Sequence, residues 1–327
     1  MLMPTPPAYA APGWLPGGHA QTLWPLLIKP RGPRLRRERW ETPDGDFIDV
    51  DFLDGPADAP LLVLFHGLEG SSRSHYAIST AQACQRAGWR LALPHFRGCS
   101  GELNRRPRAY HSGDSAEIDW ILRQLHAQNG ERQLHAAGVS LGGNALLKWG
   151  GEQGERAGEI VTGIAGICAP LDLTACGHHL ARGFNRVYTQ HFLSTLKRIS
   201  AARLRHHPGL FDAQRMRAAS NLWQFDDAVT GPIHGFAGAD DYWRRSSAKP
   251  FLADIRVPTL AVNPKNDPFL PAAYLPHGHE VSPWVRLEQP AAGGHVGFVS
   301  GPFPGTLDWL PQRLLHFFLY ETQKNEP

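Results

Sequence analysis

Apolar and polar positions change rhythm regularly from about residue 45 onward, where short apolar runs alternate with longer amphipathic stretches. Strands are expected at residues 47–53, 59–65, 89–94, 133–139, 160–170, 257–263 and 284–290. Helices are expected at residues 75–87, 114–126, after Ser140 and at 306–320, where Pro311 marks a kink or a helix start. The alternation predicts an α/β fold with a mostly parallel central sheet and helices on both faces.

The strand runs differ in their pattern. Residues 59–65, APLLVLF, are continuously apolar, as in a strand that is buried on both faces. Residues 47–53, FIDVDFL, alternate like an edge strand. From residue 171 to 250 the strand rhythm disappears, and short amphipathic helices rich in Arg, His, Phe and Trp are expected. We interpret 171–250 as a helical cap inserted into a single domain that spans residues 1–327.

The composition is that of an ordinary globular protein, with 42% hydrophobic and 19% charged residues. Lys and Arg exceed Asp and Glu by only three, 33 against 30, which is too few to indicate a nucleic-acid partner. The one dense basic run, residues 29–40, is expected to be a solvated connector, with contact to an anionic membrane or RNA as the alternative.

The four cysteines are scattered without a close pair, which favours a reducing compartment over disulfides or zinc ligands. Prolines interrupt the first 18 residues, where a signal peptide needs an unbroken apolar helix. No apolar run reaches the roughly 18 residues of a bilayer span. A cytoplasmic protein is therefore expected, without stable membrane insertion and with peripheral contact left open.

The candidate chemistry starts at Ser140, inside the motif Gly-x-Ser-x-Gly at residues 138–142. A predicted strand precedes the motif and a predicted helix follows it, so the serine is expected in a strained turn that leaves room only for glycine beside it. The helix N-terminus would point its amides toward charge that develops next to Ser140. The context favours a nucleophile over a plain turn.

A serine nucleophile needs a histidine base and a carboxylate that orients the base. Asp267 lies at the end of a predicted strand, and His295 lies in the glycine-rich loop after the next one. The chain order of nucleophile, acid and base is that of α/β hydrolases. The competing acids Asp226, Asp227, Asp240 and Asp241 fall inside the expected cap. His295 is one of 17 histidines, and a surface or core role is its alternative.

Acyl transfer also needs donors for a tetrahedral oxyanion. The amide of Leu141, directly after Ser140, is the first candidate. The second is the amide of Leu68, in the loop HGLEG that follows an early strand. Ser71, Ser72 and Ser74 in the same stretch are also suited to cap the next helix, and both roles can hold together.

The chain resembles the YheT-like family of the α/β-hydrolase superfamily, which contains serine esterases related to animal membrane-associated lipid hydrolases. The resemblance covers nearly the whole length. It rests on the segments at 17–25, 66–76, 94–114, 136–152 and 263–271. It implies the α/β-hydrolase fold, with Ser140, Asp267 and His295 as nucleophile, acid and base. Relatives often carry two acidic residues in the acid turn, where this chain has Asn266 and Asp267.

No metal or organic cofactor is expected. His19, His66, His95 and His111 lack the spacing of ligand pairs. No chemical role follows for GGHAQT at residues 17–22. Arg97, in the segment at 94–114, is interpreted as pairing with an internal carboxylate more readily than with a substrate.

The sequence thus predicts a serine carboxylic-ester hydrolase for short- to medium-chain acyl esters. The alternatives are a membrane-surface lipase or phospholipase and a non-catalytic binding protein with a hydrolase fold. The partner is a small-molecule or lipid ester, and the oligomeric state stays open. One set of cap side chains forms either an apolar acyl pocket or packing against the sheet: Phe184, Tyr188, Phe192, Leu196, Leu222, Trp223 and Phe225.

Overall fold

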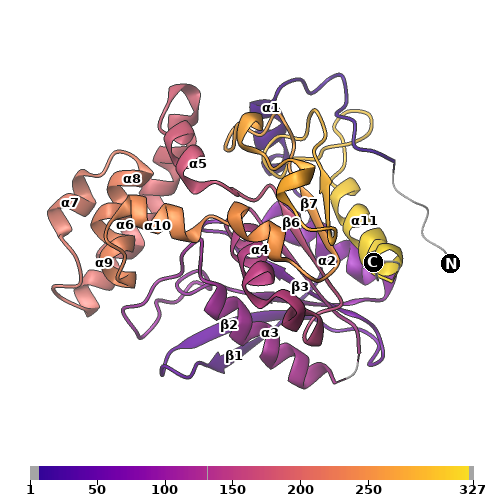
Figure 1. Cartoon of the computed structure of the whole chain (residues 1–327), viewed down its shortest axis with the longest axis horizontal. Helices are drawn as coiled ribbons and strands as arrows, with labels where there is room; N and C mark the ends of the chain where they lie inside the picture. Colours follow the sequence, from indigo (N-terminus) through magenta and orange to yellow (C-terminus); the bar gives the residue numbers. More distant parts are fainter. Residues whose placement is uncertain (1–6, 131, 324–327) are drawn as a thin grey trace.

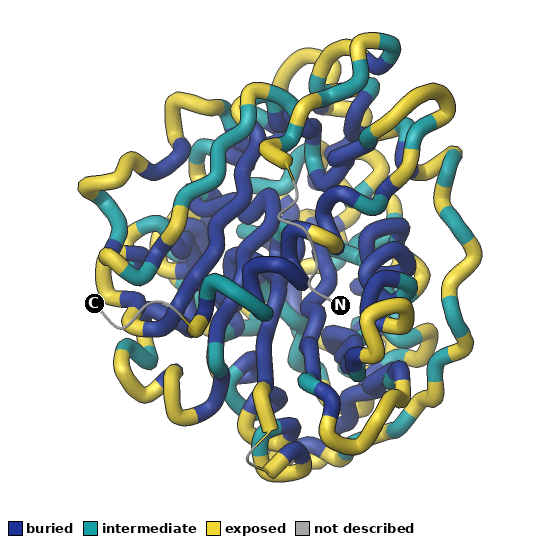
Figure 2. Tube along the Cα trace, turned by 90° about the vertical axis from the view of Figure 1, so that its right-hand side faces the viewer, coloured by how far each residue is buried: buried dark blue, intermediate teal, exposed yellow. Residues whose placement is uncertain are grey.

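A twisted eight-stranded sheet runs through the molecule, and its central strands are among the most deeply buried parts of the chain (Figures 1 and 2). The computed structural model describes residues 7–130 and 132–323. The strand order is β1-β2-β4-β3-β5-β6-β7-β8. The strands are β1 (Arg36–Glu41), β2 (Phe47–Leu53), β3 (Leu61–Phe65), β4 (Arg90–Pro94), β5 (Leu134–Val139), β6 (Gly163–Ile167), β7 (Thr259–Val262) and β8 (Val285–Glu288). Only β2 runs antiparallel to its neighbours, so the predicted α/β class with a mostly parallel sheet is confirmed.

Both faces of the sheet are covered. Along β3, the side chains of Leu61 and Val63 enter one apolar core and those of Leu62 and Leu64 enter another, because successive residues point to opposite faces. Helices α3 (Ser115–Asn129) and α4 (Leu141–Gln153) supply the first core. Helices α2 (His75–Ala87) and α11 (Trp309–His316) supply the second.

The last helix begins at Trp309, ahead of Pro311. Proline is tolerated there because the first turn of a helix lacks intrahelical acceptors for its amides. The helix then continues into a π-helical turn, Phe317–Glu321, without a break. The two alternatives expected from the sequence, a kink or a helix start at Pro311, are therefore both wrong.

The edge of the sheet differs from the sequence-based prediction. The expected edge strand at 47–53 is β2, and it is not at the edge, because β1 pairs with its outer side. The prediction of a solvated connector at residues 29–40 is accordingly wrong for Arg36 to Trp40. Arg37 and Arg39 reach across the strand pair and form ion pairs with Asp51 and Asp49. The basic residues thus neutralise buried carboxylates of β2.

The connection between β6 and β7 is helical. It consists of α5 (Leu173–Leu180), α6 (Arg186–His206), α7 (Ala213–Ala218), α8 (Leu222–Phe225), a π-helical turn (Asp226–Thr230), α9 (Gly231–His234), α10 (Ala239–Ser246) and a 3-10 turn (Lys249–Asp254). These helices gather beside the sheet as a separate layer with an apolar cluster of their own (Figure 1). Helix α6, with 21 residues, is longer than the short helices expected there.

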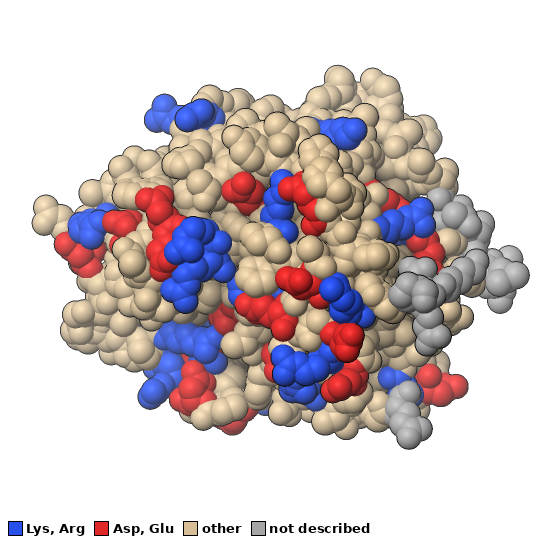
Figure 3. All heavy atoms as spheres, viewed as in Figure 1, with Lys and Arg blue, Asp and Glu red and all other residues tan. Residues whose placement is uncertain are grey.

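The surface carries both signs of charge. On the face seen in Figure 3, Lys and Arg lie among Asp and Glu and form no continuous basic area. Within residues 7–130 and 132–323, no helix is both long and apolar enough to cross a membrane. Residues 1–6 of the proline-interrupted N-terminus lie outside the described part of the chain.

Candidate functional site

Ser140 occupies a sharp turn between β5 and α4. Its φ of 51° is in the left-handed region, which is costly for a residue with a side chain. The turn is held by a hydrogen bond from its own amide to the Ile167 carbonyl, 2.8 Å, and by one from the Asn144 amide to its carbonyl, 3.0 Å. The serine is thus fixed in a strained conformation at the carboxyl end of the sheet.

Glycines around Ser140 are required by close backbone contacts. A Cβ atom at Gly142 would lie 2.5 Å from the His66 carbonyl oxygen, and one at Gly138 would collide with the Gly142 carbonyl. A Cβ atom at Gly67 would lie 3.1 Å from the Ser140 Cβ. The expected reason for the glycines flanking Ser140 is therefore visible in the packing.

The three predicted triad residues meet at one point. The Nε2 atom of His295 is 3.0 Å from the Ser140 Oγ, and its Nδ1 atom is 2.9 Å from an Asp267 carboxylate oxygen. Asp267 follows β7 and His295 follows β8, so both come from loops at the same end of the sheet as Ser140. When Nδ1–H donates to Asp267, Nε2 is left to accept the serine proton.

The imidazole of His295 is oriented on its other sides as well. Phe269 stacks on the ring at a centroid distance of 3.9 Å. The second carboxylate oxygen of Asp267 accepts the Phe269 amide at 2.8 Å. The Asp267 side chain is 3% exposed and that of His295 is 10% exposed, so solvent reaches the histidine and hardly reaches the acid.

The N-terminal motif at 17–22, to which no chemical role is assigned from the sequence, holds the loop of His295. In α1 (Gly18–Leu23), the Thr22 hydroxyl accepts the His295 amide at 2.8 Å and donates to the Gly18 carbonyl at 2.7 Å. The Gln21 side-chain oxygen accepts the Gly293 amide at 2.8 Å and the Asn266 side-chain amide at 2.9 Å. One short helix therefore joins the loop of the acid to the loop of the base.

Asn266, which directly precedes Asp267, also belongs to this hydrogen-bond network. The Asn266 side-chain oxygen accepts the Gly294 amide at 3.0 Å, next to His295. Asn266 thus helps to hold the loop of His295, whereas Asp267 contacts the His295 ring itself. Thr22, Gln21 and Asn266 were missed as functional positions, because their partners lie far away in the sequence.

The loop with Leu68 packs directly against Ser140. The amides on either side are engaged, Gly67 with the Tyr76 hydroxyl and Glu69 with the Tyr110 hydroxyl, both at 2.9 Å. The Leu68 amide between them and the Leu141 amide donate no hydrogen bond within the described residues. Leu141 is the first residue of α4, where amides have no intrahelical acceptor. Two unengaged donors therefore lie on the two chain segments that meet at the serine.

Histidine 66 fixes this loop. Its Nδ1–H donates to the Gly67 carbonyl at 2.7 Å and its Nε2 accepts the Phe96 amide at 3.0 Å. Burial lowers the pKa of His66 to about 3, so the ring is neutral and both bonds persist at physiological pH. His75 is neutral for the same reason, because burial lowers its pKa to about 4. Its Nε2–H donates to the Val296 carbonyl.

A metal site does not fit the residues present. Among the described residues, one group of His, Cys, Asp and Glu brings its ligand atoms within 4.8 Å, namely Cys168, Asp267 and His295. Asp267 and His295 are bonded to each other. Burial and the neighbouring Asp267 raise the pKa of the Cys168 thiol, which disfavours the thiolate that a metal needs.

The competing acids of the cap lie elsewhere. Asp226 accepts hydrogen bonds from Thr230 and Trp243, Asp227 pairs with Arg215, and Asp241 pairs with Arg244. Asp240 accepts the Trp223 indole N–H. No hydrogen bond among the described residues links them to His295.

Arg97 has the structural role expected for it. The guanidinium is 4% exposed and forms ion pairs with Asp44, Asp46 and Glu117. Pairing with an internal carboxylate is thereby confirmed. The charges fix the loop after β4 to the turn between β1 and β2.

A groove of about 620 Å³ opens above Ser140 and His295. Its walls come from the loop at Leu68, from α1 and from α6, including Leu23, Tyr188 and Phe192. Of the cap side chains considered for an acyl pocket, Tyr188 and Phe192 line this groove. Leu196, Leu222 and Phe225 line a second cavity behind the Leu68 loop. Phe184 is 54% exposed, and Trp223 packs within the cap.

Known proteins are similar to this chain in sequence and in fold. The sequence model of the alpha/beta hydrolase fold matches residues 60–302. "Putative esterase YheT" of Escherichia coli (strain K12) is 40% identical over 307 residues, which cover 90% of this chain and 88% of that protein. "Phospholipase ABHD3" of Homo sapiens is 27% identical, covering 89% of this chain and 73% of its own length.

Among solved structures, "Ferulic Acid bound to Est1E from Butyrivibrio proteoclasticus" superposes with a TM-score of 0.56 at 13% identity. The superposition covers 88% of this chain and all of that chain. At this identity the likeness concerns the fold alone.

Proposed function

Because this chain belongs to the alpha/beta hydrolase fold family, and within it to the YheT-like branch, we propose that it is a serine carboxylic-ester hydrolase. Ser140 is the nucleophile, His295 the general base and Asp267 the acid that orients the base. The observation that carries the proposal is the continuous pair of contacts from Ser140 Oγ to His295 Nε2 and from His295 Nδ1 to Asp267.

In the first half of the reaction, His295 Nε2 takes the proton of Ser140 while Oγ attacks the ester carbonyl carbon. The carbonyl oxygen becomes an oxyanion, for which the amides of Leu68 and Leu141 are the donors. Each such hydrogen bond is worth about 3 kcal/mol in a transition state. The protonated imidazole then gives its proton to the leaving alcohol, and an acyl-serine remains.

In the second half, a water molecule takes the position of the alcohol. His295 removes one of its protons, and the hydroxide attacks the acyl-serine carbonyl. Collapse of the second tetrahedral intermediate releases the carboxylic acid and returns the proton to Ser140. Asp267 stabilises the imidazolium in both halves and keeps the ring in one tautomer.

The substrate class follows from the walls of the site. The groove is lined by apolar and aromatic side chains, which favour an acyl ester over a highly polar substrate. The groove and the inner cavity beside the Leu68 loop together leave room for an ester with a short- to medium-chain acyl group. The names of relatives agree with ester chemistry, since one is called an esterase and another a phospholipase.

The test is hydrolysis of p-nitrophenyl esters with two to twelve acyl carbons by the wild-type protein and by Ser140→Ala. We expect turnover that peaks at a short or medium chain length and that Ser140→Ala abolishes. Absence of turnover at every chain length would overturn the proposal. So would turnover that survives the substitution. Circular dichroism of both proteins checks that the variant is folded.

A membrane-surface lipase is the second candidate, and the rim of the groove favours it. Leu26 is 60% exposed and Val187 is 56% exposed, and both line the groove together with Lys29 and Arg73. An apolar rim with basic residues is suited to an anionic lipid surface. Rates measured below and above the micelle concentration of one ester separate the two functions. A rate that rises only above that concentration would favour the lipase.

A third possibility is a hydrolase-fold protein that binds an ester without turnover. The contacts among Ser140, His295 and Asp267 speak against it, because a binding protein does not need a serine in reach of a base. In either function, we propose that residues 171–250 act as a cap within one domain spanning residues 1–327, and that the protein works in the cytoplasm without a metal or organic cofactor.

A further inference from the structure

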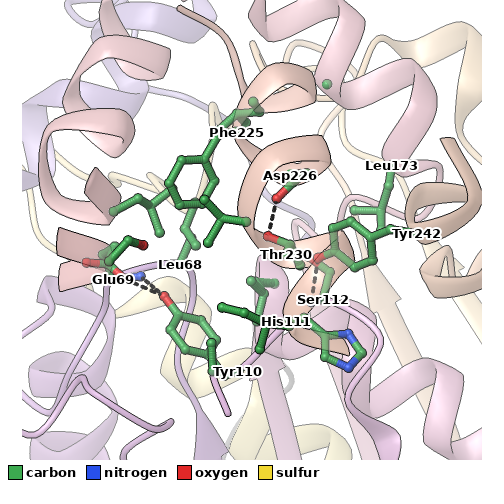
Figure 4. Close-up of a pocket in the computed structure, with 18 of the residues that line it drawn as sticks. Leu68, Glu69, Tyr110, His111, Ser112, Leu173, Phe225, Asp226, Thr230 and Tyr242 are labelled. Carbon is green, nitrogen blue, oxygen red and sulfur yellow. Dashed lines mark hydrogen bonds between the residues drawn. The ribbon is translucent and has the colours of Figure 1, made fainter. Parts of the chain in front are cut away.

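An inner cavity lies behind the Leu68 loop, between the carboxyl end of the sheet and the cap (Figure 4). The centre of a water molecule can occupy about 110 Å³ of it, and a single water needs about 10–15 Å³, so several atoms of a ligand fit. Leu68 and Glu69 line both this cavity and the groove of Ser140. The loop with Leu68, the residue proposed to hold the oxyanion, therefore forms a wall of both spaces.

Most of the cavity wall is apolar. Leu141 and Leu68 form its sheet side, and cap residues form the opposite side. Leu173 and Phe225 face this space from α5 and α8 (Figure 4). On α6 the lining residues are spaced as one helical face: Leu196, Ile199, Ser200 and Arg203. A charged side chain thus ends a row of otherwise uncharged ones.

Arg203 is buried without a partner. Its side chain is 4% exposed, and no described residue forms a hydrogen bond or an ion pair with its guanidinium. The Nε atom is fully buried and unsatisfied. Burial lowers the pKa of Arg203, although an arginine remains charged at physiological pH. A buried cation without a partner is costly, and a ligand that supplies an anion would remove that cost.

The cavity carboxyls are engaged elsewhere. Glu69 accepts the Tyr110 hydroxyl at 2.7 Å, and burial raises its pKa. Asp226 accepts Thr230 at 2.6 Å and the Trp243 indole at 2.8 Å, and burial raises its pKa to about 6. Figure 4 shows the bonds from Tyr110 to Glu69 and from Thr230 to Asp226. Neither carboxyl lies within ion-pair distance of Arg203, although the charge of Glu69 acts on Arg203 at longer range.

We propose that the inner cavity binds an anionic group at the far end of the acyl chain of the substrate, with Arg203 as its partner. The inference rests on the proposed function and names the substrate class as esters of acids with a second, negatively charged terminus. The acyl part is assigned to this cavity because Leu68 and Leu141 carry the amides that face the acyl carbonyl. The open groove is left for the alcohol, which must depart to solvent.

The guanidinium is suited to the planar carboxylate of a dicarboxylic acid half-ester, which it can bind with two parallel hydrogen bonds. Hydrogen bonds to charged groups contribute more than neutral ones, so the expected preference is about tenfold to a hundredfold. A neutral chain of the same length would leave the cation unpaired.

The test compares two esters with the same alcohol and the same acyl length, p-nitrophenyl hexanoate and the mono-p-nitrophenyl ester of adipic acid. Wild type should hydrolyse the adipate half-ester with a kcat/KM at least tenfold higher than that of the hexanoate. Arg203→Met keeps the aliphatic stem and should reduce the ratio to one or below, chiefly through KM. Arg198→Met, an exposed position on the same helix, should keep the wild-type ratio.

A second measurement does not depend on turnover. Tryptophan fluorescence of Ser140→Ala, with Trp243 in the cavity wall, should report tighter binding of monoethyl adipate than of ethyl hexanoate. Thermal unfolding should show Arg203→Met folded and no less stable than wild type, since it loses an unpaired buried charge.

The outcomes separate the two proposals. If the protein hydrolyses hexanoate through Ser140 with a ratio of one or less, the inference is overturned and the esterase function stands. If neither ester is hydrolysed and no fluorophosphonate reacts with Ser140, the esterase function fails and the substrate class falls with it. Equal binding of the two ethyl esters by Ser140→Ala would also contradict the inference.

Discussion

The carboxyl end of the sheet and the helical cap differ in how their buried polar groups are paired. At the carboxyl end of the sheet, His295 is bonded to Asp267 and to Thr22, and Gln21 accepts hydrogen bonds from Gly293 and Asn266 in the adjoining loops. In the cap, Arg203 has no partner among the described residues, whereas Arg97, equally buried, binds three carboxylates. The difference teaches that the groups proposed to react are held in place by the protein itself, whereas the charge in the cavity wall is left for the proposed ligand.

The largest effect on activity is expected at the carboxyl end of the sheet, where Ser140, His295 and Asp267 lie. His295→Gln removes the base and should lower kcat by about 10⁴-fold or more, because serine without a base is a poor nucleophile. His191→Gln is the matched control, since His191 lines the same groove and, among the described residues, forms no hydrogen bond with Ser140. Its kcat should change less than threefold on p-nitrophenyl esters. Equal losses in both variants would show that the groove and not the base is decisive.

In the cap, the carboxyl group of Asp226 should make the stability of the protein depend on pH. The pKa of Asp226 is raised by burial from 3.8 to about 6, so the folded state binds the proton more tightly than the unfolded state. The contribution of Asp226 to the free energy of unfolding should therefore fall as pH rises from about 4 to about 6. It should then stay lower by about 2–3 kcal/mol.

Asp226→Asn retains partners for Thr230 and Trp243 and should remove this fall, so that the variant is more stable than wild type at pH 7.5. Urea unfolding between pH 4 and 8 measures the difference. Asp240→Asn, at an exposed position of α10, is the control and should follow the wild-type curve. A variant less stable than wild type at pH 7.5 would contradict the assignment of an ionised, destabilising carboxylate.

The smallest effect is expected at Thr22, which holds the loop of His295 and forms no hydrogen bond with Ser140 or Asp267. Thr22→Val removes the acceptor of the His295 amide and should lower kcat about fivefold to tenfold with little change in KM. Thr22→Ser keeps the hydroxyl and should restore most of the rate. If the valine variant matches wild type, α1 does not position the base.

These regions also differ in how far the sequence predicts them. Ser140, Asp267 and His295 each follow a recognisable strand, and the carboxyl ends of parallel strands meet at one edge, so local patterns were enough to bring them together. The role of Gln21 could not be found in this way, because its partner Gly293 lies 272 residues away. Local patterns carry no sign of such a bond.

Strand β1 was missed for a related reason. Its Arg and Glu residues look like a solvated segment, and the charges make sense only opposite Asp49 and Asp51 of β2. Arg203 was not distinguished from the other basic residues of the cap for the same reason. Its burial depends on how α6 packs beside Gly98 in the loop after β4, and the spacing of apolar residues alone does not predict this packing.

The central claim is that Ser140 is the nucleophile, and covalent trapping tests it most directly. The wild-type protein is treated with a fluorophosphonate, digested and analysed by mass spectrometry, with Ser140→Ala in parallel. We predict one adduct, on the peptide that contains Ser140, and none in the variant. An unmodified wild-type protein, or an adduct that persists in Ser140→Ala, would contradict the account.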